Sequence, residues 1–461
     1  MPKTGENENV ARVDVVDDDA RPRAGRTECR IGANLHFDAE ALASYFFAQW
    51  EPVVFDALLI AAAVEFCDKL KRRSSLLWPR AFELQIPVHD SARWAQREIA
   101  GSLQDALEFL TGDRWGLEFV PRKKPADQPQ QGLFDLPVAD SPAVVPFSEG
   151  LDSRAVAGLM ARELGDRLIR ARLGTKSDDR PKEPSGRKLP FAAVPYNVRP
   201  SNEKRFVESS ARSRGFKFAL LSGLAAYLAK ADRIIVPESG QGALGPSLVP
   251  VGQAYEDYRN HPMFTDKMSV FLKALLDREF RFEFPRLWST KGQTLREYAS
   301  GHGVSPKDWA DTRSCWQDNR HVSVNRHRRQ CGICAACMLR RLSVHAAGLS
   351  ERKDTYIWED LRAASFESGA ARGFNKMDAQ RNYAIAGTLH LDHLASLRRS
   401  PIHEHRLNLS AYHLARSFGA KKDAIRGKID DLLNQHEQEW NAFMDYLGPN
   451  SFVAKWTERA A

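Results

Sequence analysis

Strand-like and helix-like patterns alternate along residues 143–348, and this alternation constrains the fold more than any other feature of the sequence. Short apolar runs such as AVVPFS and DRIIVPES predict buried strands, while SRAVAGLMARELG and FKFALLSGLAAYLAKA predict helices. Strands that alternate with helices form parallel sheets, because each crossover places a helix on a face of the sheet. The segment is therefore predicted to be an α/β domain whose chemistry lies where the strands end.

The flanking segments differ in character from this central region. The first one mixes a helical pattern with the strand-like runs FELQIPVHD and WGLEFVPR, whereas the last has helical periodicity, as in KKDAIRGKIDDLLNQHEQEWNAFMDYL. The predicted organisation is a disordered tail over 1–27, an α+β domain over 28–125, a linker over 126–142, the α/β domain over 143–348 and a helical extension over 349–461.

The composition narrows the class of protein. The hydrophobic content of 43% supports real cores, and no run approaches twenty uninterrupted apolar residues, so we expect no membrane span. The acidic, polar first residues lack the layout of a secretory signal, so we expect a cytoplasmic protein. A net charge of +8 is mild for 461 residues, and we expect no nucleic-acid partner.

The turn SEGLDS joins a predicted strand to a predicted helix. Such a turn aims free backbone N–H groups at one point, and the helix dipole favours an anion there. Ser148 and Ser153 can donate hydroxyl hydrogen bonds, Gly150 permits close approach of a ligand, and Asp152 can position a metal ion on phosphates. A capped helix start without a nucleotide is the alternative interpretation.

Four of the six cysteines fall within one short stretch, SCWQDNRHVSVNRHRRQCGICAACMLRR. Two consecutive C-x-x-C steps let thiolates converge on one ion, and a fourth thiolate completes a tetrahedron. Closed four-thiolate sites usually hold structural zinc, while an iron–sulfur cluster is the competing interpretation. The predicted metal ligands are Cys315, Cys331, Cys334 and Cys337.

The turn SEGLDS resembles the SGGxDS signature of the PP-loop ATP pyrophosphatases, which split ATP into a substrate adenylate and pyrophosphate. Glu149 stands where that signature has the first of its two glycines. A carboxylate that faces a polyphosphate is unfavourable by several kcal/mol. Either the Glu149 side chain points away from the nucleotide, or the use of ATP is altered.

Together, this turn and the run C…CGxCxxC resemble the QueC family, the 7-cyano-7-deazaguanine synthases, over about residues 144–348. The resemblance implies a PP-loop fold (adenine nucleotide alpha hydrolase-like, Rossmann-like) with a zinc knuckle, and the cofactors ATP, Mg²⁺ and Zn²⁺. The added flanks and the loop PESGQGALGPSLVP resemble the enlarged QueC-like proteins of bacterial antiphage defence, QatC of the Qat system and its counterpart in type IV CBASS.

The resemblance implies an ATP-dependent ligase that forms a C–N bond. ATP would adenylate the carboxylate of 7-carboxy-7-deazaguanine, and an amine would then attack. The amine is ammonia in ordinary members, which yields the nitrile, and the N-terminal glycine of a partner protein in the defence-linked ones. A tRNA-modifying PP-loop enzyme and a catalytically inactive scaffold, which Glu149 favours, are the alternatives.

The resemblance also implies roles for individual residues. Lys291 is a candidate second phosphate contact, Arg212 and Arg214 can hold a carboxylate or phosphate, and Glu238 can read the guanine-like edge or bind a metal. For the arginines a solvated helix start, and for Glu238 a helix-cap or loop carboxylate, is an equally good interpretation. The nucleotide contacts are Ser148, Glu149, Gly150, Leu151, Asp152 and Ser153, and the catalytic residues are Asp152, Arg212, Arg214, Glu238 and Lys291.

Overall fold

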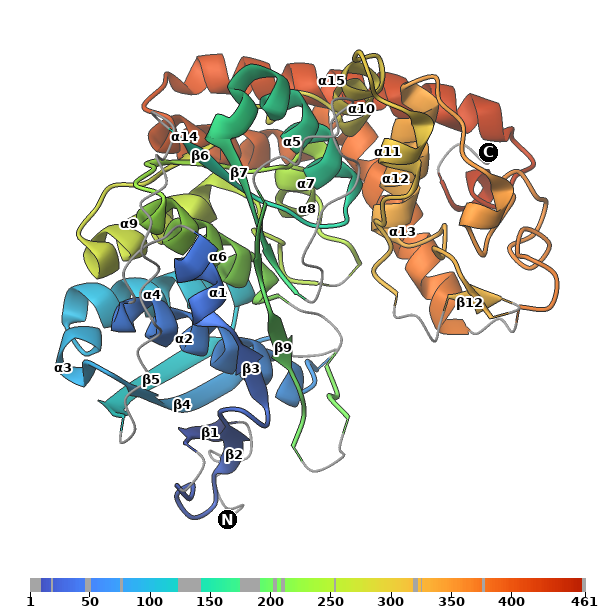
Figure 1. Cartoon of the computed structure of the whole chain (residues 1–461). Coiled ribbons are helices and arrows are strands. Elements are labelled where there is room, and N and C mark those ends of the chain that lie inside the picture. The colour runs from blue at the N-terminus through green and yellow to red at the C-terminus, as the bar shows by residue number, and fades with distance from the viewer. Residues whose placement is uncertain are drawn as a thin grey trace. The chain divides into compact units, whose positions relative to one another are not determined.

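The structure is a computed structural model of the chain (Figure 1), and it describes residues 10–17, 20–45, 51–74, 78–122, 142–174, 191–201, 205–208, 212–252, 254–317, 322–324, 326–374 and 378–457. Contacts divide the chain into two compact units built from separated segments. The first comprises Met1–Phe147, Glu163–Val236 and Asp257–Glu283, and the second Ser148–Arg162, Pro237–Glu256 and Phe284–Ala461. This grouping differs from the predicted division, because the strands of the central region group with the N-terminal segment.

The first unit contains the predicted parallel sheet. Its five strands run in the order β11-β10-β6-β7-β8, and every pairing is parallel, which confirms the prediction. Helix α6 (Arg214–Leu228) packs against β6, β7 and β10, as an apolar crossover helix must. The strands are β6 (Ala143–Pro146), β7 (Leu168–Leu173), β8 (Phe191–Val194), β10 (Arg233–Ile235) and β11 (Arg281–Glu283).

A second parallel sheet, in the order β2-β1-β4-β5, is formed by the N-terminal residues of the same unit. Its strands are β1 (Val10–Val16), β2 (Thr27–Arg30), β4 (Ala81–Val88) and β5 (Arg114–Pro121). Strand β1 lies in the segment predicted to be a disordered tail, so that prediction is wrong for these residues. The acidic composition suggested disorder, but Asp14 is buried and forms ion pairs with Arg23 and Arg26, so its charge is compatible with a folded strand.

Helices complete the first unit. Helix α2 (Pro52–Leu70) is buried along nearly its whole length, and its Asp56 carboxylate accepts hydrogen bonds from the His89 backbone at 2.9 Å and from Trp94 at 3.1 Å. The remaining elements are β3 (Leu35–Phe37), β9 (Tyr196–Val198), α1 (Ala39–Tyr45), α2 (Pro52–Leu70), α3 (Ser91–Trp94), α4 (Arg97–Thr111) and α9 (Pro262–Leu276). Of the predicted linker, only Pro142 lies within the described residues.

The second unit is mainly helical and includes the predicted C-terminal helices, of which α15 is the long red helix in Figure 1. No helix in the described ranges is both long and apolar enough to cross a bilayer. Its elements are α5 (Leu151–Leu164), α7 (Gly240–Ala243), α8 (Gly245–Leu248), α10 (Lys291–Ala299), α11 (Pro306–Ala310), β12 (Ser323–Val324), β13 (His327–Arg328), α12 (Ala335–Ala346), α13 (Asp378–Ser396), α14 (Glu404–Ser417) and α15 (Lys422–Leu447).

Two buried histidines lie among these helices. His390 of α13 contacts the Val249 carbonyl through Nδ1 at 2.7 Å, and His436 of α15 contacts the Leu391 carbonyl through Nε2 at 2.9 Å. Burial lowers the pKa of both imidazoles to about 4, because the charged form loses its hydration. Both rings are therefore neutral at pH 7.

We predict that the second unit loses stability as the pH falls from 6.5 to 4. In this pH range the two histidines bind protons in the unfolded chain but stay neutral in the folded chain. Protonation therefore favours the unfolded state and lowers the free energy of unfolding by up to roughly 3 kcal/mol per histidine below pH 4. Urea unfolding at pH 7 and pH 4 measures this loss. H390Q and H436Q should each flatten the pH dependence relative to the unmodified chain, and an unchanged dependence would contradict the burial of the two rings.

Candidate active site and metal centre

The predicted phosphate turn leads directly into α5. The Ser148 and Ser153 hydroxyls lie 2.9 Å apart, and the Gly150 N–H donates to the Ser148 hydroxyl at 3.1 Å. Leu151 is fully buried and fixes the first turn of the helix. The hydroxyls and the glycine thus stand together at the start of a 14-residue helix, where an anion is favoured.

Glu149 holds the turn through its backbone. Its carbonyl accepts the Arg313 N–H at 2.7 Å, which ties the turn to the segment leading to Cys315. A glycine at position 149 would make the same contact. The backbone bond therefore gives no reason for a glutamate at this position, and the effect of its side chain on ATP stays a prediction.

Asp152 and Lys291, two of the predicted catalytic residues, meet in one ion pair. The Lys291 ammonium contacts Asp152 Oδ2, and the Ser239 hydroxyl donates to Asp152 Oδ1 at 2.9 Å. All three residues are buried, with exposed fractions of 9% for Asp152, 7% for Lys291 and 0% for Ser239. Three segments far apart in the sequence thus join beside the turn. Ser239 follows Glu238 directly but was not among the residues predicted from the sequence.

The start of α10 fixes the backbone of Lys291. Thr290 is the N-cap, and its hydroxyl accepts the Gln293 N–H at 3.1 Å while Gln293 Oε1 accepts the Thr290 N–H at 2.9 Å. This reciprocal capping box satisfies two N–H groups that a helix start leaves free. Lys291 is therefore the first residue of a well-capped helix.

Glu238 lies between β10 and α7 and is half-buried. A Cβ atom placed on Gly242 would fall 2.1 Å from its Oε1, so the carboxylate rests against the helix where only a glycine leaves room. This placement suits either a ligand acceptor or a carboxylate that stabilises the start of α7. Both interpretations from the sequence therefore stand.

Arg212 and Arg214 belong to the first unit. Arg212 Nη1 lies 3.5 Å from Asp257 Oδ2, and its guanidinium lies 4.9 Å from the centre of the Trp78 ring. The Arg214 guanidinium lies 5.4 Å from the centre of the Phe218 ring. These contacts give both arginines packing partners within that unit, and their assignment to a carboxylate or phosphate remains a proposal.

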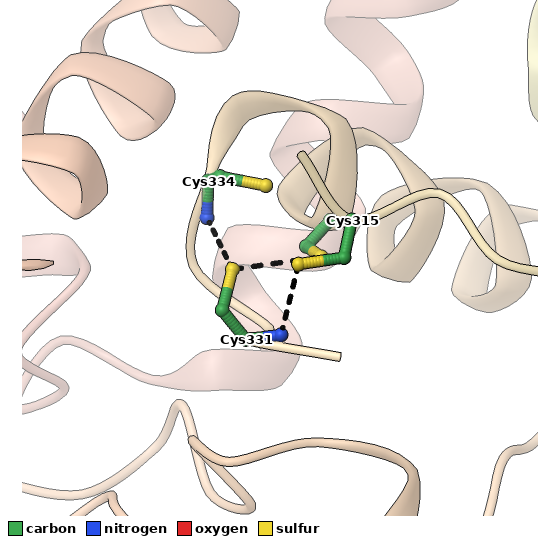
Figure 2. A group of neighbouring side chains, drawn as sticks. Cys315, Cys331 and Cys334 are labelled. Carbon is green, nitrogen blue, oxygen red and sulfur yellow. Dashed lines mark hydrogen bonds between the residues drawn. The ribbon is translucent and has the colours of Figure 1, made fainter. Parts of the chain in front are cut away.

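The four clustered cysteines form a tight group in the second unit. All four sulfur atoms lie within 4.8 Å of one another, and those of Cys331 and Cys337 are 3.7 Å apart. A tetrahedral zinc ion with ordinary Zn–S bonds places its sulfurs about 3.8 Å apart, so the group fits zinc. Figure 2 shows Cys315, Cys331 and Cys334 with their sulfur atoms turned toward a shared centre.

Backbone geometry prepares this group for thiolates. The Cys331 N–H donates to the Cys315 sulfur at 3.2 Å, and the Cys334 N–H donates to the Cys331 sulfur at 3.3 Å. Gly332 adopts a φ of 84°, a left-handed conformation that favours glycine and turns the chain between the first two ligands of the run. Burial raises the pKa of the Cys331 and Cys337 thiols, whereas hydrogen bonds from Cys331 and the other cysteines lower that of Cys315. A cation at the centre would favour all four thiolates.

We predict that the purified chain carries one zinc ion and that C334S removes it. C334S should also lower the melting temperature, because the stability that the bound ion gives to the fold is lost. Elemental analysis and thermal unfolding measure both effects. The matched control is C67S, which alters a buried cysteine outside the group and should leave the metal content unchanged. Iron in place of zinc, or full zinc content in C334S, would contradict the assignment.

Part of the chain matches a known protein family. Residues 244–348 match the model of the family described as queuosine biosynthesis protein QueC, a region that holds Lys291 and the four cysteines. The comparisons with curated proteins and with solved structures found no match. The matched region supports a QueC-like relationship for this part of the chain, and this similarity indicates an ATP-using enzyme of the PP-loop type.

Proposed function

We propose that this chain uses ATP to activate the carboxylate of 7-carboxy-7-deazaguanine and joins it to an amine, the N-terminal glycine of a partner protein in bacterial antiphage defence. The observation that carries the proposal is the buried pair of Asp152 and Lys291 beside the phosphate turn, in the unit that holds most of the QueC-like region.

The first step needs stabilisation of a departing anion. A carboxylate oxygen of the substrate attacks the α-phosphorus of ATP, and the bond from that phosphorus to pyrophosphate breaks. The turn offers the Ser148 and Ser153 hydroxyls and the N–H groups at the start of α5, and Lys291 offers a positive charge. When bound, Mg²⁺ would neutralise phosphate charge, and the Asp152 carboxylate suits it as a ligand.

The second step transfers the activated acyl group. A neutral amine attacks the carbonyl carbon of the acyl adenylate, loses a proton, and expels AMP, which leaves an amide. Glu238 can accept hydrogen bonds from the guanine-like edge of the substrate and so orient the carbonyl. A protein amine is favoured over ammonia because the helical segment 349–461 and the N-terminal sheet lie outside the region that matches QueC.

The decisive experiment offers the chain ATP, Mg²⁺ and 7-carboxy-7-deazaguanine with either ammonium or a peptide that begins with glycine. Release of pyrophosphate and AMP is measured, and products are identified by mass. We expect a deazaguanine amide on the peptide. A nitrile formed only with ammonium would instead support 7-cyano-7-deazaguanine synthesis, and the absence of ATP turnover would support the inactive scaffold that Glu149 favours.

We predict that D152N and K291M each reduce pyrophosphate release by about 100-fold or more, because K291M removes the positive charge offered to the departing pyrophosphate and D152N removes the carboxylate that pairs with Lys291 and suits Mg²⁺ as a ligand. Circular dichroism and thermal unfolding check the fold, since either change leaves a buried charge without its partner. E404Q removes the carboxylate of the surface pair with Arg426 in the same unit and should keep full activity. Normal turnover in D152N would refute the site assignment.

We also predict that G242A raises the KM for the deazaguanine acid and leaves the KM for ATP unchanged. The added methyl group would meet the Glu238 carboxylate, which must then move. Steady-state kinetics measures both constants. The control G427A adds a methyl group in α15 where no atom lies within 4 Å, so both constants should stay the same. Equal KM values in G242A and G427A would show that Glu238 does not read the substrate.

A further inference from the structure

The buried face of α15 carries two polar residues, His436 and Glu439. They are three positions apart and so share one face of the helix, and their exposed fractions are only 0% and 6%. Their neighbours on this face are apolar, among them Leu433 and Trp440. Buried polar groups cost free energy unless they have hydrogen-bond partners. His436 has partners in α13 and α7, and one carboxylate oxygen of Glu439 has a partner at the start of α10.

His436 connects to the backbone of Lys291 through one residue. Its Nε2 lies 2.9 Å from the Leu391 carbonyl, which can only accept, so this nitrogen carries the proton of the neutral ring. Nδ1 then accepts a hydrogen bond from Gln241 Nε2 at 2.7 Å. That assignment turns Gln241 Oε1 toward the Lys291 N–H, which donates to it at 2.8 Å. Because the Leu391 carbonyl can only accept a hydrogen bond, it determines which atom donates and which accepts in the bonds from His436 to Gln241 and from Gln241 to Lys291.

The Lys291 N–H is the first of the N–H groups that have no partner inside α10, so Gln241 supplies a bond that the helix cannot make. Glu439 holds Thr290, the residue before Lys291, because its Oε1 accepts a hydrogen bond from the Thr290 hydroxyl at 2.6 Å. Two successive residues at the start of α10 are thus held by side chains whose positions depend on α15.

Glycines let α15 and its neighbours come this close. A Cβ atom on Gly240, next to Gln241, would fall 2.6 Å from Leu432 Cδ2, and one on Gly292 would lie 3.2 Å from both Glu439 carboxylate oxygens. Larger residues at positions 240 and 292 would therefore meet side chains of α15, in addition to the Leu287 carbonyl and the Ala346 side chain. The close packing at these glycines and the hydrogen bonds therefore favour the same position of α15.

We infer that α15 positions Lys291 for its reaction, with Gln241, His436 and Glu439 as positioning residues. The inference deepens the proposed function, since it rests on Lys291 acting at the phosphates. Lys291 can meet the departing pyrophosphate reliably only if its backbone is held in place, and a misplacement of about 1 Å can cost 100-fold in rate. The helical extension is then a working part of the active site in addition to any role in binding a partner.

Amide hydrogen exchange of Lys291 tests the positioning without any need for activity. H436L should release Gln241 and speed exchange of the Lys291 amide at least tenfold. The matched control H390L alters another fully buried histidine of this unit, one that contacts the Val249 carbonyl, and should leave that amide protected. If H436L does not fold, Q241L replaces it in the test. This variant removes the acceptor of the Lys291 N–H and should likewise speed exchange of that amide. Unchanged exchange in the folded variant would overturn the inference.

Kinetics then tests whether the positioning matters to the reaction. H436L should lower kcat for pyrophosphate release by 10-fold or more relative to H390L at equal thermal stability, and H436Q, which keeps a donor and an acceptor, should recover most of it. Equal rates in H436L and H390L would overturn the catalytic part of the inference. If the unmodified chain turns over no ATP, the proposed function fails, while the exchange result still decides the positioning.

Discussion

The ion pair between Asp152 and Lys291 is the interaction on which the rest of the candidate site depends. Two opposite charges that are both buried are stable only with close contact and further hydrogen bonds, and Ser239 supplies one of them. The pair joins the helix that follows the phosphate turn to the start of α10. Anything that displaces one of these segments separates the charges, so the surrounding structure must hold both in place.

The helical extension meets part of this requirement. Its long helix α15 contributes no group to the phosphate turn, yet His436 and Glu439 end in hydrogen bonds that reach Lys291 and its N-cap. A QueC-like region and the segment after it therefore share one hydrogen-bond network within the second unit. Hydrogen bonds within this network account for both ring nitrogens of His436 and for one carboxylate oxygen of Glu439.

Much of the fold and of the site was predictable from sequence. The alternating patterns predicted the parallel sheet, and the two C-x-x-C steps predicted the cysteine group, because both depend on contacts between residues near in sequence or on strict periodicity. Other features were missed. Strand β1 was hidden by the charge of Asp14, and Ser239 and Gln241 gave no pattern that set them apart. His436 left one trace, a polar residue in the apolar stripe of α15.

The sequence by itself determined the alternation of strands and helices in the central region, the turn with its small hydroxyl residues, and the group of four cysteines, because local periodicity and short spacing suffice for these. Only the tertiary structure decided that Lys291 pairs with Asp152 across 139 positions, and that Gln241 links it to His436 across 195. Such pairs are set by how helices pack and by which buried polar atoms need partners. Neither condition leaves a regular pattern along the chain.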